Sequence, residues 1–137
     1  MTDENRRRNL ALELERADQA LRAAEALLGL ALFSDAVSRA YYAAFHFLRA
    51  LLLTRGLEPK SHRGAIHLFN AEFVRPATFS TAHNRLLAGL QRARELADYD
   101  SAVAFSLEDA RAEIEDARRF GSEIRAFLVR EGWSPAG

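Results

Sequence analysis

Apolar side chains recur at steps of three and four residues through most of this chain, which is the spacing of one face of an α-helix. Residues 4–31 carry an apolar seam made of Leu10, Leu14, Ala17, Leu21, Ala24, Leu28 and Ala31. Residues 34–56 carry a second seam made of Val37, Tyr41, Ala44, Leu48 and Leu51. No segment alternates polar and apolar residues as a half-buried strand would. The pattern therefore predicts an all-α protein.

The second of these segments has clear start and stop signals. Ser34 is a typical N-cap, and Gly56 is placed to end the helix in a left-handed conformation. The break before this helix is short, so the first two helices should pack as antiparallel neighbours. Phe45 and Phe47 extend its apolar surface beyond the main seam, which favours a homodimer.

A short third helix is expected over residues 62–73, because Pro59 interrupts the preceding helix and Ser61 can cap a new one. A fourth helix should run from caps near residues 78–81 to about residue 98. The expected inward positions of these two helices are Ile66, Phe69, Phe73, Leu86, Leu87, Leu90, Ala93 and Ala97.

A fifth helix should follow a loop over residues 98–106, because Ser106 and Asp109 resemble a capping box. Its seam consists of Ala110, Ile114, Ala117, Gly121, Ile124 and Leu128. Residues 133–137 are expected to form a frayed tail. The predicted architecture is a single domain over residues 1–137, an antiparallel up-and-down bundle of four long helices plus one short helix across one end or side.

The absence of cysteine excludes disulfides, thiolate nucleophiles and zinc–thiolate sites, and it is compatible with a reducing compartment. No apolar run is long enough for a membrane span, and the charged residues 1–10 lack the apolar core of a signal peptide. We therefore expect a soluble, cytoplasmic protein without membrane association.

The formal net charge is zero, but the charges are unevenly distributed. Residues 34–94 hold nine bases against three acids together with all four histidines, whereas residues 95–137 hold five Arg against ten acids. A nucleotide or RNA phosphate would suit the basic segment. Alternatively, the acidic C-terminal helix neutralises it, and the sequence leaves both interpretations open.

Arg39, Tyr42 and His46 share one face of the second helix, together with Arg49 and Leu53. Histidine exchanges a proton near neutral pH and arginine holds phosphate through paired donors, so Arg39 and His46 are candidate catalytic residues for RNA cleavage. This chemistry needs no metal or other cofactor. Tyr42 lies between them as a candidate ligand-binding residue. Alternatively, carboxylates from neighbouring helices satisfy the Arg and the His, and the pair is structural.

Lys60 and His62 flank the cap of the third helix, where free backbone N–H groups and the helix dipole favour an anion. They are further candidate ligand-binding residues, and the alternative is a solvated turn with a good cap. His62 and His67 are five residues apart and no acid cluster accompanies them, so no metal site is expected.

Arg94 and Asp98 are four residues apart on the fourth helix and can form an intrahelical ion pair. Arg94 is also a candidate ligand-binding residue. Asp98 and Tyr99 are candidate supporting residues that organise the Arg/His face of the second helix.

Three motifs occur in order, namely SRAYYAAFH at 38–46, KSH at 60–62 and RELADY at 94–99. Together they resemble the small bacterial and archaeal branch of the HEPN family (higher eukaryote and prokaryote nucleotide-binding). The resemblance implies a helical bundle, frequent dimerisation and pairing with a minimal nucleotidyltransferase in toxin–antitoxin-like modules. Many HEPN proteins are metal-independent endoribonucleases with an Arg-x(4–6)-His motif, which corresponds here to Arg39 and His46.

Two functions of different classes are therefore compatible with the sequence. The first is a HEPN-type nucleotide- or RNA-binding domain with ribonuclease activity at Arg39 and His46. The second is a non-catalytic helical adaptor that binds a partner protein, in which the same two residues mainly stabilise the bundle.

Overall fold

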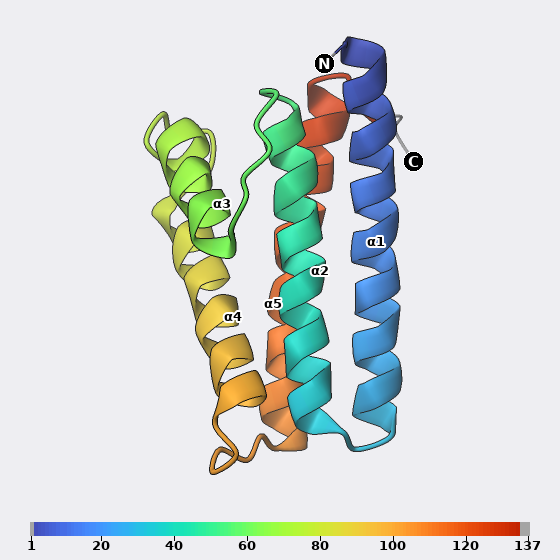
Figure 1. The fold of residues 1–137 in the computed structure, drawn as a ribbon, viewed down its shortest axis with the longest axis vertical. Helices are drawn as coiled ribbons and strands as arrows, with labels where there is room; N and C mark the ends of the chain where they lie inside the picture. The colour runs from blue at the N-terminus through green and yellow to red at the C-terminus, as the bar shows by residue number, and fades with distance from the viewer. Residues whose placement is uncertain (1, 135–137) are drawn as a thin grey trace.

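The computed structural model describes residues 2–134, and every regular element in that range is helical (Figure 1). In chain order the elements are α1 (Asp3–Gly29), α2 (Phe33–Leu53), α3 (His62–Phe69), the π-helical turn η1 (Asn70–Val74), α4 (Thr81–Tyr99) and α5 (Leu107–Arg130). The four long helices run alternately up and down, and short α3 packs at the side, beside α4 (Figure 1). The expected all-α class and bundle arrangement are confirmed.

Helix α2 forms the centre of the bundle, because it contacts α1, α3, α4 and α5. Its predicted seam is buried in full, and so is the predicted seam of α5. The seam of α1 is buried at Leu10, Leu14, Ala17 and Ala24 but only partly at Leu21 and Leu28. Ala31, expected at the end of that seam, is exposed in the turn that follows α1.

The expected N-cap at Ser34 is wrong, because the cap position is occupied by Leu32, two residues earlier, and α2 begins at Phe33. Helix α1 ends with Ala31 in the left-handed region at φ +61°. The N–H of Leu32 then donates to the carbonyl of Leu27 at 2.9 Å. This closure leaves the carbonyl of Leu32 free to accept the first bond of α2, from the N–H of Ala36 at 3.0 Å. Ser34 therefore lies inside the first turn.

Most of the other predicted helix ends are confirmed with small shifts, but α3 ends at Phe69 rather than at residue 73, and the π-helical turn η1 follows it to Val74. Gly56 has φ +69° and follows α2, as expected for a left-handed end. The side chain of Ser61 accepts the N–H of Gly64 at 2.9 Å, and Ser106 with Asp109 forms the predicted reciprocal capping box. Helix α4 extends one residue past the expected end, so residues 98 and 99 are helical rather than part of a loop.

The expected frayed tail is wrong at Trp133. Its N–H donates to the carbonyl of Leu128 at 2.8 Å, and its ring packs against the core. The guanidinium of Arg7 lies 4.8 Å from the ring centre, and Arg7 also donates to the carbonyl of Gly132 at 2.7 Å. These contacts attach the end of α5 to α1, while residues 135–137 lie outside the described residues.

The apolar surface expected from Phe45 and Phe47 is not available for dimerisation. Phe47 is 2% exposed and packs where Gly121 of α5 leaves room for its ring. Phe45 is also buried, because it stacks on His62 with a centroid distance of 4.2 Å. Both rings therefore belong to the core of the single chain.

Candidate functional site

The candidate site lies on the face of α2 between α1 and α4, because His46 contacts Glu13 of α1 and Tyr42 lies against Arg94 of α4. Figure 1 shows α2 between these two helices. Arg39, Tyr42, His46 and Arg49 project along this face, as the helical spacing predicted. Arg39 is exposed, whereas the other three are partly buried. Leu53, expected on the same stripe, is buried and belongs to the core.

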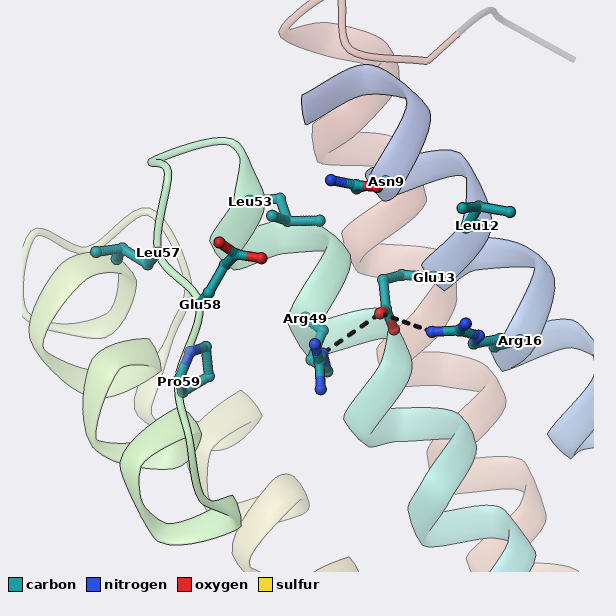
Figure 2. Close-up of a pocket in the computed structure, with 9 residues that line it drawn as sticks. All are labelled: Asn9, Leu12, Glu13, Arg16, Arg49, Leu53, Leu57, Glu58 and Pro59. Carbon is teal, nitrogen blue, oxygen red and sulfur yellow. Dashed lines mark hydrogen bonds and ion pairs between the residues drawn. The ribbon is translucent and has the colours of Figure 1, made fainter. Parts of the chain in front are cut away.

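A buried carboxylate of α1 is the centre of the charged contacts on this face. Glu13 is only 5% exposed, and its Oε2 lies 2.7 Å from Nδ1 of His46. Its other oxygen, Oε1, lies 3.4 Å from Nε of Arg49 and 3.4 Å from Nη1 of Arg16. Figure 2 shows Glu13 between the two arginines. One acid thus links three basic side chains from two helices.

The protonation of this group follows from its surroundings. Burial alone would raise the pKa of Glu13, but the hydrogen bond from His46 and the charges of Arg49 and Arg16 outweigh burial and lower that pKa. The carboxylate is therefore ionised and can only accept a hydrogen bond. Nδ1 of His46 must donate to it, so Nε2 is the ring nitrogen that does not contact Glu13.

A groove of about 320 Å³ lies between α1 and α2 beside this histidine. Its lining residues are Arg16, Gln19, Ala20, Ala23, Arg39, Tyr42 and His46. The three catalytic and ligand-binding candidates predicted on α2 are therefore brought together in one groove. Arg39 lies over the Tyr42 ring, 5.9 Å from its centre, and makes no ion pair with a residue in the range 2–134. Its donors are thus available to an anion in the groove.

A second hollow, of about 200 Å³, lies on the other side of Arg16 (Figure 2). Two arginines, Arg16 and Arg49, and two acids, Glu13 and Glu58, contribute to its wall. The charges balance, and apolar side chains such as Leu12 and Leu57 complete the lining. This hollow therefore lacks the excess of positive charge that an anion site requires.

The residues predicted on α3 and α4 form a separate cluster, which contacts the Tyr42 ring but does not line the groove. The Tyr41 hydroxyl lies 2.6 Å from Nδ1 of His62. Burial raises the pKa of Tyr41 to about 12, so the phenol keeps its proton. Burial and the nearby positive charges of Arg94 and Arg49 lower the pKa of His62, so the imidazole is neutral. We therefore assign the phenol as donor and Nδ1 of His62 as acceptor.

Arg94 is only 8% exposed, and its guanidinium lies among three tyrosine rings. The distances from its central carbon to the ring centres are 5.1 Å for Tyr41, 5.8 Å for Tyr42 and 5.8 Å for Tyr99. It also contacts Asp98 at 3.6 Å, which is the predicted intrahelical pair, and the Tyr99 hydroxyl at 3.4 Å. Arg94 thus packs against the Tyr42 ring from the side of α4, and it does not line the groove.

The remaining predicted residues lie outside the groove. Lys60 is exposed in the turn before α3. His62 reaches Tyr42 edge-on, with a centroid distance of 6.0 Å, but it does not line the groove. No group of three or more His, Cys, Asp or Glu suited to a metal ion occurs among the described residues. Within the same residues, no helix is long and apolar enough to cross a membrane.

Glu13 is the residue of this site that the sequence interpretation missed. It lies three residues after Leu10 and four before Ala17, so it occupies the inner face of α1 among buried apolar positions. An acid at such a position requires a buried partner, and this signal was present in the sequence. The partner itself could not be inferred, because the register between α1 and α2 sets which residue Glu13 meets.

The fold and this groove together define an all-helical bundle with an arginine and a histidine on one face of its central helix. Residues 11–134 match the family model of the HEPN domain. The chain therefore belongs to the HEPN family, as the three sequence motifs indicated.

The chain also matches several relatives over most of its length. "Putative toxin MJ0605" of Methanocaldococcus jannaschii is 37% identical over 115 residues, which are 84% of this chain and 85% of the relative. "Putative toxin MJ0142" of the same archaeon is 29% identical over 123 residues, 90% of this chain and 84% of the relative. "UPF0332 protein glr0978" of Gloeobacter violaceus is 38% identical over 118 residues, 85% of this chain and 94% of the relative.

Proposed function

We propose that this protein binds RNA in the groove between α1 and α2 and cleaves it without a metal ion. The observation that carries the proposal is the orientation of His46 by the buried carboxylate of Glu13, in a groove that also presents Arg39. Such cleavage requires an imidazole nitrogen that can take a proton and a guanidinium that binds phosphate, and His46 and Arg39 bring these two groups to one groove.

In the proposed reaction, Nε2 of His46 takes the proton of a ribose 2′-hydroxyl. The 2′-oxygen attacks the adjacent phosphorus, and the bond from phosphorus to the 5′-oxygen breaks. Arg39 binds the phosphate oxygens and stabilises the charge that develops on them. Water protonates the departing 5′-oxygen, so the products end in a 2′,3′-cyclic phosphate and a 5′-hydroxyl.

The other predicted residues have ligand-binding or supporting roles in this proposal. Tyr42, at the wall of the groove, offers a flat ring against which a base can stack. Arg94 fixes that ring from behind, and Asp98 with Tyr99 holds Arg94 in place. Lys60, exposed in the turn before α3, adds a positive charge that attracts the phosphate backbone, while the neutral His62 supports the Tyr42 ring edge-on.

The biological role we propose is that of a toxin in a two-gene module with a minimal nucleotidyltransferase as its partner. Support comes from the names of the two archaeal relatives and from the resemblance of the motifs to such HEPN proteins. A homodimer is also proposed on that resemblance. Sedimentation at micromolar concentration tests it, and a monomer alone would contradict it.

The direct test is an RNA cleavage assay in the presence of EDTA. Wild type should cleave, and His46→Ala should not, while both proteins fold. His67→Ala is the matched control, because His67 is exposed on α3 and does not line the groove. Equal cleavage by wild type and His46→Ala would contradict the catalytic role of this histidine.

The second candidate function is a non-catalytic adaptor that binds a partner protein. It is favoured by the internal pairing of the site, because Glu13 satisfies both His46 and Arg49. Under this alternative, His46→Ala and Arg39→Ala would lower the melting temperature, and added nucleotide or RNA would leave it unchanged. A rise of the melting temperature with RNA, lost in Arg39→Ala, supports the first function.

A further inference from the structure

The end of the bundle where the α1–α2 turn meets the α4–α5 loop exposes a group of apolar side chains. Leu30 is 69% exposed, Leu32 is 46% exposed and Leu107 is 40% exposed. A hollow of about 360 Å³ lies at the same end and is lined by residues 31–35 and 103–105, Leu32 among them. We call the hollow and these three leucines the apolar end. Both connections lie at the lower end of the bundle in Figure 1.

The two chain segments that form the apolar end carry only acidic charged side chains. Residues 23–38 and 98–110 contain six acids and no Arg, Lys or His. Glu25 pairs with Arg118 and Asp98 pairs with Arg94. The other four acids form no ion pair within the described range, and they are Asp35, Asp100, Glu108 and Asp109.

The helix dipoles do not cancel this negative charge. Two helices, α2 and α5, begin at this end, and two others, α1 and α4, finish here. Their partial charges are opposite in sign and of similar size, so they offset one another. The four carboxylates therefore set the potential at the apolar end.

The turn that carries Leu30 and Leu32 is held in one conformation. Ala31 between them has φ +61°, a region that costs a residue with a side chain about 1 kcal/mol. The hydrogen bond from the N–H of Leu32 to the carbonyl of Leu27 keeps the turn closed. The two leucines are thus presented in a fixed arrangement, which lowers the entropy cost of binding.

We propose that the apolar end binds a basic, amphipathic helical segment of a partner protein. Its apolar side chains fill the hollow between Leu32 and Phe105, and its Lys or Arg side chains meet Asp35, Asp100 and the acids at the start of α5. The negative charge argues against the other occupants, because a second copy of this end, an RNA strand and an anionic lipid surface would all be repelled.

This surface is separate from the proposed RNA site. At about 1.5 Å per residue, His46 lies about 20 Å along α2 from Phe33. A segment bound at the apolar end therefore leaves His46 uncovered. The proposal does not depend on the ribonuclease activity and would stand if that activity were absent.

The test uses two fluorescent synthetic helical peptides of equal length, both with Leu on one face, and with either Lys or Glu on the other face. Fluorescence polarisation with the full chain should show saturable binding of the Lys peptide and none of the Glu peptide. The double variant Leu30→Ser/Leu32→Ser should weaken binding at least about tenfold. Val129→Ser is the matched control, because Val129 is 38% exposed near the opposite end of α5.

A second variant measures the contribution of the acids separately from that of the leucines. It also tests the proposal if the leucine variant fails to fold. Asp35→Asn/Asp100→Asn should weaken binding of the Lys peptide at low salt, and the difference from wild type should shrink as salt rises. Binding that is equal in wild type and both variants, or no binding of the Lys peptide to wild type, would overturn the proposal. So would a dimer that Leu30→Ser/Leu32→Ser converts to a monomer, because the occupant would then be a second copy.

Discussion

The carboxylate of Glu13 lies 2.7 Å from Nδ1 of His46, so a buried acid of α1 orients the imidazole at the centre of α2. The same carboxylate contacts Arg49 and Arg16 through its second oxygen. A side chain with three such contacts has little freedom to move. The imidazole of His46, which lines the groove together with Arg39, is therefore held in one orientation.

Replacing Glu13 with Gln should destabilise the protein by about 1–3 kcal/mol. Glutamine keeps an oxygen that can accept from His46, but the neutral amide leaves Arg49 and Arg16 without their buried counter-charge. Urea unfolding at pH 7 measures the loss. Glu15→Gln is the control, because Glu15 is exposed on the same helix. Equal unfolding midpoints for the two variants would show that the charge of Glu13 contributes little to stability.

The stabilisation from Glu13 should disappear in acid. Its contacts in the folded protein lower its pKa below the ordinary value of 4.5, so the folded state binds its proton less tightly than the unfolded state does. The contribution is therefore complete above about pH 4.5 and is lost as the pH falls through the folded-state pKa. Free energies of unfolding for wild type and Glu13→Gln should converge at low pH. A constant difference from pH 7 down to pH 3 would contradict this assignment.

Glu113 of α5 should make the protein less stable as the pH rises, whereas Glu13 makes it less stable as the pH falls. Burial, together with the negative charges of Asp116 and Asp109, raises its pKa to about 7. Its Oε2 is buried and has no hydrogen-bond partner among the described residues. The folded state holds this proton more tightly than the unfolded state, so stability should fall as the pH rises from about 4.5 to about 7.

The variant Glu113→Gln removes that titration and should be more stable than wild type at pH 8. We expect a gain of about 1 kcal/mol, because solvent screens a carboxyl group that is only half buried. Thermal unfolding at pH 5 and pH 8 measures it, with Glu15→Gln as the control. If Glu113→Gln lost as much stability as wild type between pH 5 and pH 8, a group other than Glu113 would cause the pH dependence.

Gly121 should not tolerate a side chain, because an added Cβ would clash with the ring of Phe47. Gly121→Ala should cost about 1–3 kcal/mol through overpacking between α2 and α5. Gly89→Ala, in α4, should instead stabilise the protein by about 0.5–1 kcal/mol, since a Cβ there meets nothing within 4 Å. Circular dichroism during heating compares the two. A stabilised Gly121→Ala would show that Phe47 can move aside.

The sequence was sufficient for the elements and the core but not for the contacts between helices. The periodicity of α2 and α5 predicted their buried faces, because burial follows directly from helical spacing. The cap at Ser34 was mispredicted, because Ala31 adopts a left-handed conformation that normally requires Gly. The burial of Phe45 and Phe47 does not follow from helical spacing, because it depends on His62 of α3 and on the space at Gly121 of α5, which are remote in sequence.

The part of the site that lies on α2 alone was predictable from the sequence, but the contacts between α2 and other helices were not. Arg39, Tyr42 and His46 line one groove, as their spacing on α2 required. Glu13 lies 33 residues from His46 in the chain, and its contact depends on the register between α1 and α2. The hydrogen bond between Tyr41 and His62 likewise depends on where α3 packs.

The ends of the RNA fragments test the central claim most directly. An oligonucleotide is incubated with the protein in EDTA, and the termini of its fragments are identified by mass spectrometry. The account predicts 2′,3′-cyclic phosphate and 5′-hydroxyl ends with wild type, no fragments with His46→Ala, and no cleavage at a position with a 2′-deoxyribose. Fragments with 3′-hydroxyl and 5′-phosphate ends, or cleavage at the deoxyribose position, would contradict a reaction that starts with His46 taking the 2′-hydroxyl proton.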